Sequence, residues 1–267
     1  MAETGRIRTG IGGWTFEPWR GVFYPPGLKH ADELRYASGR LTSIEINSTY
    51  YSSQKPESFA KWAAATPDGF KFSVKASRFA TNRRVLADGA DSVDKFLNQG
   101  ISELGARLGP ILWQFMPTKK FDYDDFAGFF DLLPSHLDGL ALRHVAEVRH
   151  ESFHSPKFVA LCRERGVAIC CSENDAYPLI ADITADFVYA RLLRGSDDIE
   201  TGYSAPDLDL WAERFATYAK GETPADLRPV DRTAPPPGPR DVFAYFINAG
   251  KVRAPAAAMA LMARTGG

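Results

Sequence analysis

The sequence predicts a single (β/α)8 barrel domain spanning residues 1–267, and three observations predict it. Short β-rich runs recur eight times along the chain, and nearly every run is followed by a segment that can form a helix. This alternation is the pattern of parallel βα units. The length of 267 residues is typical of such barrels, and no break in composition divides the chain into two parts.

The strands are predicted from β-branched and aromatic runs that lie between turn residues. Helices are predicted between the strands, and Pro56, Pro206 and Pro255 stand where a helix would begin. The link 173–185 is too irregular to predict a helix. The predicted strands are 7–12, 42–47, 70–75, 109–115, 140–149, 167–172, 186–193 and 241–247. The predicted helices are 30–39, 56–65, 89–107, 122–133, 155–165, 206–220 and 255–264.

The proline-rich stretch 229–240 leads into the last predicted strand. In a barrel it would therefore lie on the amino-terminal face, away from the face where barrel enzymes hold their chemistry. We interpret it as a stiff connector within the domain.

The overall charge gives no reason to expect a global field that attracts nucleic acid or anionic membrane. The 32 lysines and arginines nearly cancel the 33 aspartates and glutamates. The first residues have no cationic and apolar leader pattern, and no window is apolar enough to cross a membrane. The three cysteines, Cys162, Cys170 and Cys171, have no metal-type spacing and are expected to be reduced and packed. We expect a cytoplasmic protein with no membrane partner; the oligomeric state is not predicted.

Strand parity predicts which side chains enter the barrel, because alternate residues of a strand share a face. In the run 42–47, Ile44 and Ile46 face the helices, so that Glu45 and Asn47 point inward with Ser43. Lysines 71 and 75 follow the same rule in the next strand, and Glu147 and Arg149 follow it in the fifth. Further polar residues stand at or near strand ends: Gln114, His150, Glu173, Arg191, Tyr245 and Asn248.

Charged side chains that point into a barrel need partners or water, because an unpaired buried charge is costly. Since several of these residues end their strands, we expect them at the carboxyl-end mouth, where barrel enzymes assemble their sites. The alternative is a structural ion-pair cluster of Glu45, Lys75, Glu147 and Arg149 that plugs the barrel.

A family resemblance agrees with this prediction. The runs GIGGWTFEPWRGVFYPPGL, IEINSTYY, FKFSVKASRF, LGPILWQF, AEVRHESF and TADFVYARLLRG resemble, in order, the signature blocks of the DUF72 (YecE-like) family. These are TIM-barrel proteins without an established activity. The resemblance implies a (β/α)8 fold with a cleft at its carboxyl-end face. The family positions that it implies here are Trp14, Trp19, Tyr24, Glu45, Asn47, Tyr50, Lys75, Gln114, Glu147, Arg149, His150, Arg191 and Gly195.

This chain departs from the family pattern in two places. The family's last strand ends in a sequence that resembles Y-F-N-N, whereas this chain has Tyr245, Phe246, Ile247 and Asn248. The family also tends to place an aspartate after strand six, where this chain offers Glu173 or Asp175.

The two glutamates suit general acid and base work, because neighbouring carboxyl groups can be held in different protonation states. We expect Glu147, next to Arg149, to be the ionised member and Glu45 to be the acid. The amine of Lys75 is suited to a Schiff base or to holding an anion, and an ion pair with a glutamate is favoured over covalent catalysis.

No nucleotide cofactor is expected, because no dinucleotide or Walker-type loop is present. A divalent metal held by Glu45, Glu147 and Glu173 stays open but is not favoured, and only five histidines are available.

The leading hypothesis is an enzyme of hydrolase or isomerase type that acts on a small, polar, anionic substrate such as a sugar or sugar phosphate. Glu45, Glu147 and Lys75 are its predicted catalytic residues. One alternative is a nucleic-acid-binding or nuclease-like barrel, and another is a non-catalytic scaffold with a structural ion-pair network. The predicted substrate-binding residues are Trp14, Asn47, Tyr50, Gln114, Arg149, His150, Arg191, Tyr245 and Asn248.

Overall fold

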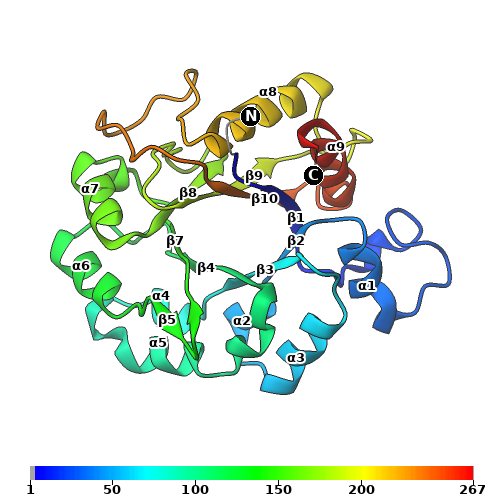
Figure 1. The fold of residues 1–267 in the computed structure, drawn as a ribbon, viewed down its shortest axis with the longest axis horizontal. Coiled ribbons are helices and arrows are strands. Elements are labelled where there is room, and N and C mark those ends of the chain that lie inside the picture. Colours follow the sequence, from blue (N-terminus) through cyan, green and yellow to red (C-terminus); the bar gives the residue numbers. More distant parts are fainter. Residues whose placement is uncertain (1–3, 267) are drawn as a thin grey trace.

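The computed structural model describes residues 4–266, which form a closed barrel of eight parallel strands surrounded by helices (Figure 1). The predicted fold class is therefore confirmed. Residues 1–3 and 267 of the predicted domain lie outside the described residues. No helix within the described part of the chain is long and apolar enough to cross a membrane.

The barrel strands follow the order β1-β2-β3-β4-β7-β8-β9-β10, and β10 pairs with β1 to close the ring. Their bounds are β1 Ile7–Gly12, β2 Ser43–Ile46, β3 Lys71–Lys75, β4 Leu108–Gln114, β7 His144–Glu147, β8 Ala168–Glu173, β9 Phe187–Arg194 and β10 Asp241–Ala249. The α-helices are α1 Glu33–Ser38, α2 Ser48–Tyr51, α3 Pro56–Ala64, α4 Arg78–Thr81, α5 Ala90–Leu97, α6 Tyr123–Asp131, α7 Pro156–Arg165, α8 Ala205–Ala219 and α9 Ala254–Thr265.

The predicted strand 140–149 contains barrel strand β7 but was wrong in extent, because a hairpin precedes the barrel strand here. Strands β5 His136–Leu137 and β6 Leu140–Ala141 pair antiparallel, and barrel strand β7 begins only at His144. The turn residues Asp138 and Gly139 both have positive φ, of 50° and 78°. Aspartate followed by glycine is the pair that a tight two-residue hairpin turn favours.

The predicted helix 89–107 was also wrong in extent. Helix α5 ends at Leu97, and the segment Ile101–Arg107 is a 3₁₀ helix that is kinked at Gly105. Gly100, with φ 108°, separates the two. A glycine in this left-handed region stops a helix because other residues rarely adopt that conformation. Likewise, the predicted helix 30–39 divides into a short 3₁₀ turn, His30–Asp32, and α1.

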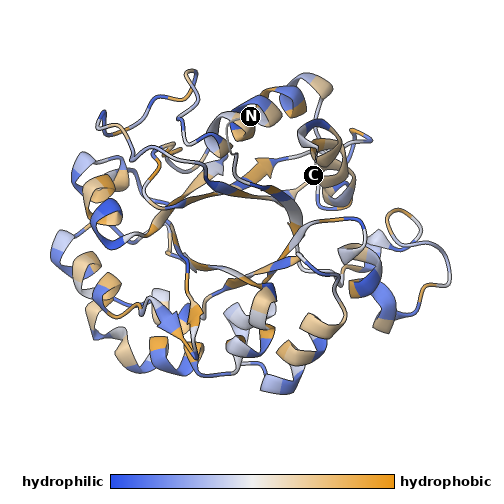
Figure 2. Ribbon diagram, in the orientation of Figure 1, coloured by the Kyte–Doolittle hydropathy of each residue, from blue (hydrophilic) through white to orange (hydrophobic). Residues whose placement is uncertain are grey.

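Two hydrophobic layers show that strand parity was correctly predicted. Side chains such as Ile44, Phe72 and Ala146 pack against the helices in the larger outer layer. The helices carry both hydrophilic and hydrophobic residues, as Figure 2 shows. A second, separate cluster fills the barrel interior, and its buried members are Leu112, Val145, Ala168, Cys170, Phe187, Tyr189, Phe243, Tyr245 and Ile247.

Closure of the barrel between β1 and β2 depends on a glycine, which has no side chain. Gly10 pairs with Ser43, and a Cβ atom on Gly10 would stand 2.0 Å from the Ser43 carbonyl oxygen. Only glycine lets the two strands approach this closely.

The proline-rich stretch 229–240 is tied to the residues that come before β9. The backbone N–H groups of Val230 and Asp231 donate to the buried carboxylate of Asp182 at 2.7 and 2.9 Å. Arg240 is buried and donates to the carbonyl oxygen of Ala185 at 3.1 Å. These contacts hold the stretch at the amino-terminal end of the barrel, away from the mouth.

Candidate functional site

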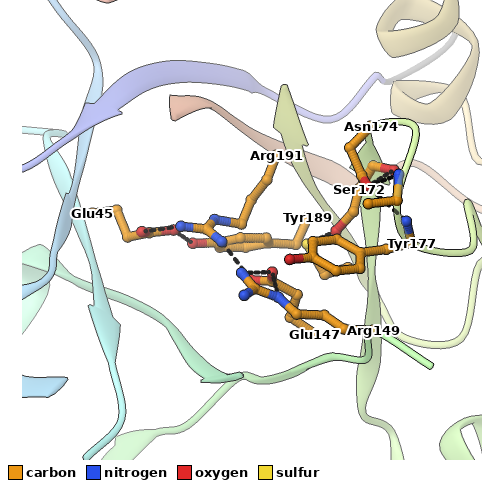
Figure 3. Close-up of polar contacts among 10 residues, drawn as sticks. Glu45, Glu147, Arg149, Ser172, Asn174, Tyr177, Tyr189 and Arg191 are labelled. Atoms are coloured by element: carbon orange, nitrogen blue, oxygen red, sulfur yellow. Dashed lines mark hydrogen bonds and ion pairs between the residues drawn. The ribbon is translucent and has the colours of Figure 1, made fainter. Parts of the chain in front are cut away.

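Side chains from three separate strands meet at the carboxyl-terminal end of the barrel (Figure 3). Glu45 comes from β2, Glu147 from β7 and Arg191 from β9. Each points inward, and the three are almost completely buried. Arg191 lies between the carboxylates: its Nη1 donates to Glu147 Oε2 at 2.6 Å, and its Nη2 donates to Glu45 Oε1 at 3.1 Å.

A second guanidinium completes the surroundings of Glu147. Arg149 donates from Nε and Nη2 to Glu147 Oε1, at 2.8 and 2.6 Å. Burial alone would raise the pKa of Glu147, but the charges of Arg191 and Arg149 outweigh it and hold this pKa below its ordinary value. Burial alone would lower the pKa of Arg191, but the carboxylates of Glu147 and Glu45 raise it above its ordinary value. Glu147 is thus an ionised carboxylate with two cationic partners, as the sequence predicted for it.

Hydrogen bonds also hold both carboxylate oxygens of Glu45. Its Oε2 accepts a hydrogen bond from the Tyr189 hydroxyl at 2.6 Å, and its Oε1 accepts the bond from Arg191. The residue has no exposed surface. A carboxyl group that exchanges protons with a substrate must reach it directly or through one water. The expected role of Glu45 as an acid is therefore not supported by its surroundings.

Two tyrosines form a layer beneath the glutamates. The Tyr189 hydroxyl lies 2.9 Å from Ser73 Oγ, and the Tyr245 hydroxyl lies 2.6 Å from Ser43 Oγ. Both rings are fully buried, and burial raises the pKa of each phenol. Tyr245, which the sequence predicted as a substrate-binding residue, is therefore packed inside the barrel below the mouth.

Lys75, the last residue of β3, differs from the other charged groups of the mouth. Its Nζ makes no hydrogen bond or ion pair with any residue in the range 4–266, although the side chain is only 9% exposed. Instead Nζ lies 4.3 Å from the centre of the Tyr50 ring. The predicted ion pair between Lys75 and a glutamate was therefore wrong, because Arg191 and Arg149 occupy the carboxylates. Burial, aided by the charge of Arg191, lowers the pKa of Lys75 to about 8.

The carboxylates of Glu45 and Glu147 raise the pKa of Lys75 and so oppose its lowering by burial. The direction of the change in each variant can therefore be predicted. Glu147→Gln removes a negative charge and should lower the pKa of Lys75 below about 8, whereas Arg149→Gln should raise it. NMR titration of the ¹³C-methylated lysine amines measures both changes, and the signal absent from Lys75→Arg assigns Lys75. A wild-type value near the ordinary 10.5 would contradict the arrangement described here.

Polar groups with free hydrogen-bonding capacity stand at the ends of the strands around the mouth. Gln114 ends β4 opposite Glu147, and its side-chain amide makes no hydrogen bond within the described part of the chain. Asn47 is half-buried and reaches only its own neighbour, the Glu45 carbonyl oxygen, at 3.4 Å. Arg149 stacks on the Tyr177 ring at 4.8 Å, and its Nη1 is without a partner in residues 4–266.

His150 and Tyr50 take defined positions beside the mouth. His150 caps the short 3₁₀ turn Glu151–Phe153, because its Nδ1 accepts from the Ser152 backbone N–H at 3.1 Å. Tyr50 is half-buried, and its ring lies under the Lys75 amine. Tyr50 thus orients Lys75, which is a different role from direct ligand contact.

Two predicted substrate-binding residues lie away from the cluster. Trp14 packs against Trp62 and Phe72, with ring centres 5.2 and 6.1 Å apart, so it belongs to the outer hydrophobic layer. Asn248 is exposed and has a φ of 68°, at an irregularity in the pairing of β10 with β9.

The metal site considered from the sequence is contradicted by the position of Glu173. Its carboxylate faces the outer layer, where it accepts hydrogen bonds from Trp211 Nε1 at 2.8 Å and from the Tyr203 hydroxyl at 2.7 Å. Burial raises the pKa of this carboxyl group. Residues 4–266 contain no group of three or more histidine, cysteine, aspartate or glutamate side chains arranged to hold a metal ion.

Two residues of the site were missed by the sequence-based list. Strand parity places Tyr189, two positions before Arg191 on β9, on the same face as Arg191, but parity alone does not show that its hydroxyl reaches a glutamate. Tyr177 lies in the irregular link between β8 and β9, where no periodicity indicates which side chain turns toward the mouth.

These features define a (β/α)8-barrel protein with an ionised, hydrogen-bonded cluster at the carboxyl ends of its strands. The chain belongs to the family described as protein of unknown function DUF72, whose model matches residues 8–267. The family resemblance in the sequence is thereby confirmed.

Relatives and solved structures agree with this membership. The chain is 24% identical over 241 residues to UPF0759 protein YecE of Escherichia coli O157:H7, a match that covers 82% of this chain and 84% of the relative. A DUF72 family protein from Thermotoga maritima MSB8 has a similar structure, with a TM-score of 0.71, 21% identity, and coverage of 96% and 97% of the two chains. A fusion protein described as a xylose isomerase-like TIM barrel and 4-hydroxyphenylpyruvate dioxygenase matches with a TM-score of 0.53 and 14% identity, over 95% of this chain and 41% of that chain. At these identities the two structures show the fold alone.

Proposed function

We propose that the carboxyl-end mouth is the active site of an enzyme that transfers protons on a small, polar, anionic substrate such as a sugar phosphate. One observation carries this proposal: the amine of Lys75 makes no hydrogen bond or ion pair in residues 4–266, lies near two buried carboxylates and has a pKa of about 8. An amine with this pKa is partly neutral near physiological pH and can accept a proton from a substrate.

The charge of the mouth supports an anionic substrate. Glu45 and Glu147 are balanced by Arg149 and Arg191, so protonated Lys75 leaves one positive charge in excess. The free Nη1 of Arg149 offers a planar donor to a phosphate or carboxylate. The free amide of Gln114 and the amide of Asn47 suit the hydroxyl and carbonyl groups of a sugar.

The state of the carboxylates favours isomerase-type chemistry over hydrolysis. Hydrolases that use two carboxyl groups need one of them to act on water or on the leaving group. Here both glutamates are fully buried, and each accepts hydrogen bonds on both carboxylate oxygens. They are therefore better suited to provide fixed negative charge below the substrate than to transfer protons. Lys75 would remove the proton from the hydroxyl-bearing carbon next to the substrate carbonyl, which gives an enediolate, and return it to the former carbonyl carbon. The hydroxyl proton would pass to the former carbonyl oxygen in the same sequence.

A second candidate, binding of nucleic acid, is favoured by one surface feature. Tyr51, the last residue of α2, and Phe79, in α4, are both exposed, and the Arg78 guanidinium lies 5.9 and 5.4 Å from their rings. Exposed aromatic rings beside arginine suit stacked bases and phosphates. A gel shift that weakens steeply with salt and is lost in Tyr51→Ala would support this candidate.

Solvent exchange tests the proton-transfer proposal without knowledge of the reaction's product. The purified chain is incubated in D₂O with a panel of aldoses, ketoses and their phosphates, and proton NMR follows the C–H signals next to each carbonyl. We expect exchange in at least one phosphorylated member, at a rate that rises with pH and levels off above about 8, because neutral Lys75 is the reactive form. Absence of exchange in every member, with no shift of the Lys75 signal, would contradict the proposal.

A further inference from the structure

A groove of about 740 Å³ lies at the amino-terminal rim of the barrel, opposite the mouth. Its walls come from residues 4–8 at the start of β1, from the loops 38–42 and 67–70, and from the carboxyl-terminal ends of α8 and α9. Figure 1 shows β1, α8 and α9 next to one another, and they are in contact in the fold. The groove is therefore a different place from the proposed active site.

The groove carries an excess of positive charge. Four of the residues that line it are cationic, namely Arg6, Arg8, Arg40 and Lys220, and only Asp68 is acidic. Asp68 is already paired, at 2.6 Å, with Arg107, which does not line the groove. The side chains of Arg6 and Lys220 make no hydrogen bond with any residue that the structure describes.

Arg8 supplies a buried guanidinium that pairs with Asp241 in poor hydrogen-bonding geometry. Its side chain is only 9% exposed and lies over the Phe243 ring, 5.3 Å from the ring centre. Nη1 is 2.9 Å from Asp241 Oδ2, but it has no hydrogen bond of acceptable geometry within residues 4–266.

Cations lie in and close to the groove, and two of them, Arg8 and Arg143, share the carboxylate of Asp241. Lys71 begins β3 beside the groove, and its pKa is lowered by burial and further by the charges of Arg8 and Arg143. Helix ends do not account for the cations. The Ala219 carbonyl oxygen at the end of α8 already accepts from the Gly5 and Arg240 backbone N–H groups at 2.9 and 3.1 Å.

An apolar wall lies beside these cations. Ile7, Leu41, Phe70 and Met262 line the same groove, and Ile7 and Met262 are only partly buried. A small inorganic anion would leave this wall uncovered. We propose that the groove binds a small organic anion that has a phosphate-like head and an apolar body, with the cations holding the head and the wall packing against the body.

Calorimetric titration of the full chain with phenyl phosphate, inorganic phosphate and phenol tests the two halves of this proposal. We expect saturable binding of phenyl phosphate that is tighter than that of either part. The double substitution of Arg40→Gln with Lys220→Gln should weaken it by about tenfold or more, because it removes charge-assisted contacts. Both residues are exposed, so the variant should fold.

The matched control lies in the mouth. Arg149→Gln should leave the affinity for phenyl phosphate in the groove unchanged, and the NMR signal of the Met262 methyl group should shift on titration. Equal affinity in wild type and double variant, loss of binding only in Arg149→Gln, or no saturable binding would each overturn the proposal. None of these outcomes depends on proton transfer at Lys75, so the two proposals can fail separately.

Discussion

Replacing Arg191 by methionine is expected to lower the free energy of unfolding by about 3–5 kcal/mol, the usual cost of removing one partner from a buried ion pair. Arg191 bonds to both Glu45 and Glu147, neither of which has exposed surface. The substitution keeps most of the apolar volume, so the loss reports on the two carboxylates that stay behind. Urea unfolding measures it.

Two further variants separate this effect from a general disturbance of β9. Arg194→Met changes the exposed last residue of the same strand and should stay within about 0.5 kcal/mol of wild type. Adding Glu45→Gln and Glu147→Gln to Arg191→Met should restore part of the loss, because no buried negative charge then remains unpaired. A loss below about 1 kcal/mol for Arg191→Met would mean that water or other groups already stabilise the carboxylates.

Replacing Lys75 by methionine is expected to slow the solvent exchange of the preferred substrate by about 10²–10⁴-fold, the usual contribution of a positioned proton-transfer group. Lys75→Arg should not restore the rate, since a guanidinium is not deprotonated in proteins. Lys120→Met, on an exposed loop after β4, serves as the control and should keep the wild-type rate. The exchange rate at saturating substrate, measured by NMR, gives the comparison.

The exchange rate of Lys75→Met also distinguishes an active site from a purely structural ion-pair cluster. A large effect of Arg191→Met on stability fits either interpretation, because both contain the same buried ion pairs. Only the active-site proposal requires Lys75, which pairs with neither glutamate, to change the rate without a large change in stability. More than half of the wild-type rate in Lys75→Met would remove the main support for the proposed function.

The fold could be predicted from the sequence because barrel strands alternate in a regular way. Ile44 and Ile46 were expected to face the helices, and both belong to the outer hydrophobic layer. The same parity brought Glu45, Glu147 and Arg191 to one end of the barrel. What parity could not indicate was the hairpin at Asp138 and Gly139, because its two short strands resemble the start of the barrel strand that follows.

The partners within the site were harder to predict, because strand parity does not show which of several nearby cations pairs with a given carboxylate. Two arginines occupy Glu147, which leaves Lys75 without the ion pair that the sequence favoured. Strand parity also ends where a strand ends. Trp14 stands beyond the end of β1 and turns toward the outer layer instead of the mouth. Glu173 is the last residue of β8 and shares the outward face with Ile169 and Cys171, so parity read over the full strand would have placed it in the outer layer.

A crystal structure of the chain with its preferred sugar phosphate tests the central claim most directly. The account predicts ligand density bounded by Lys75, Gln114 and Arg149, with a carbon next to the carbonyl facing Lys75 Nζ and the phosphate on Arg149 Nη1. Density for the sugar phosphate only in the amino-terminal groove or elsewhere on the surface, with none beside Lys75, would contradict it.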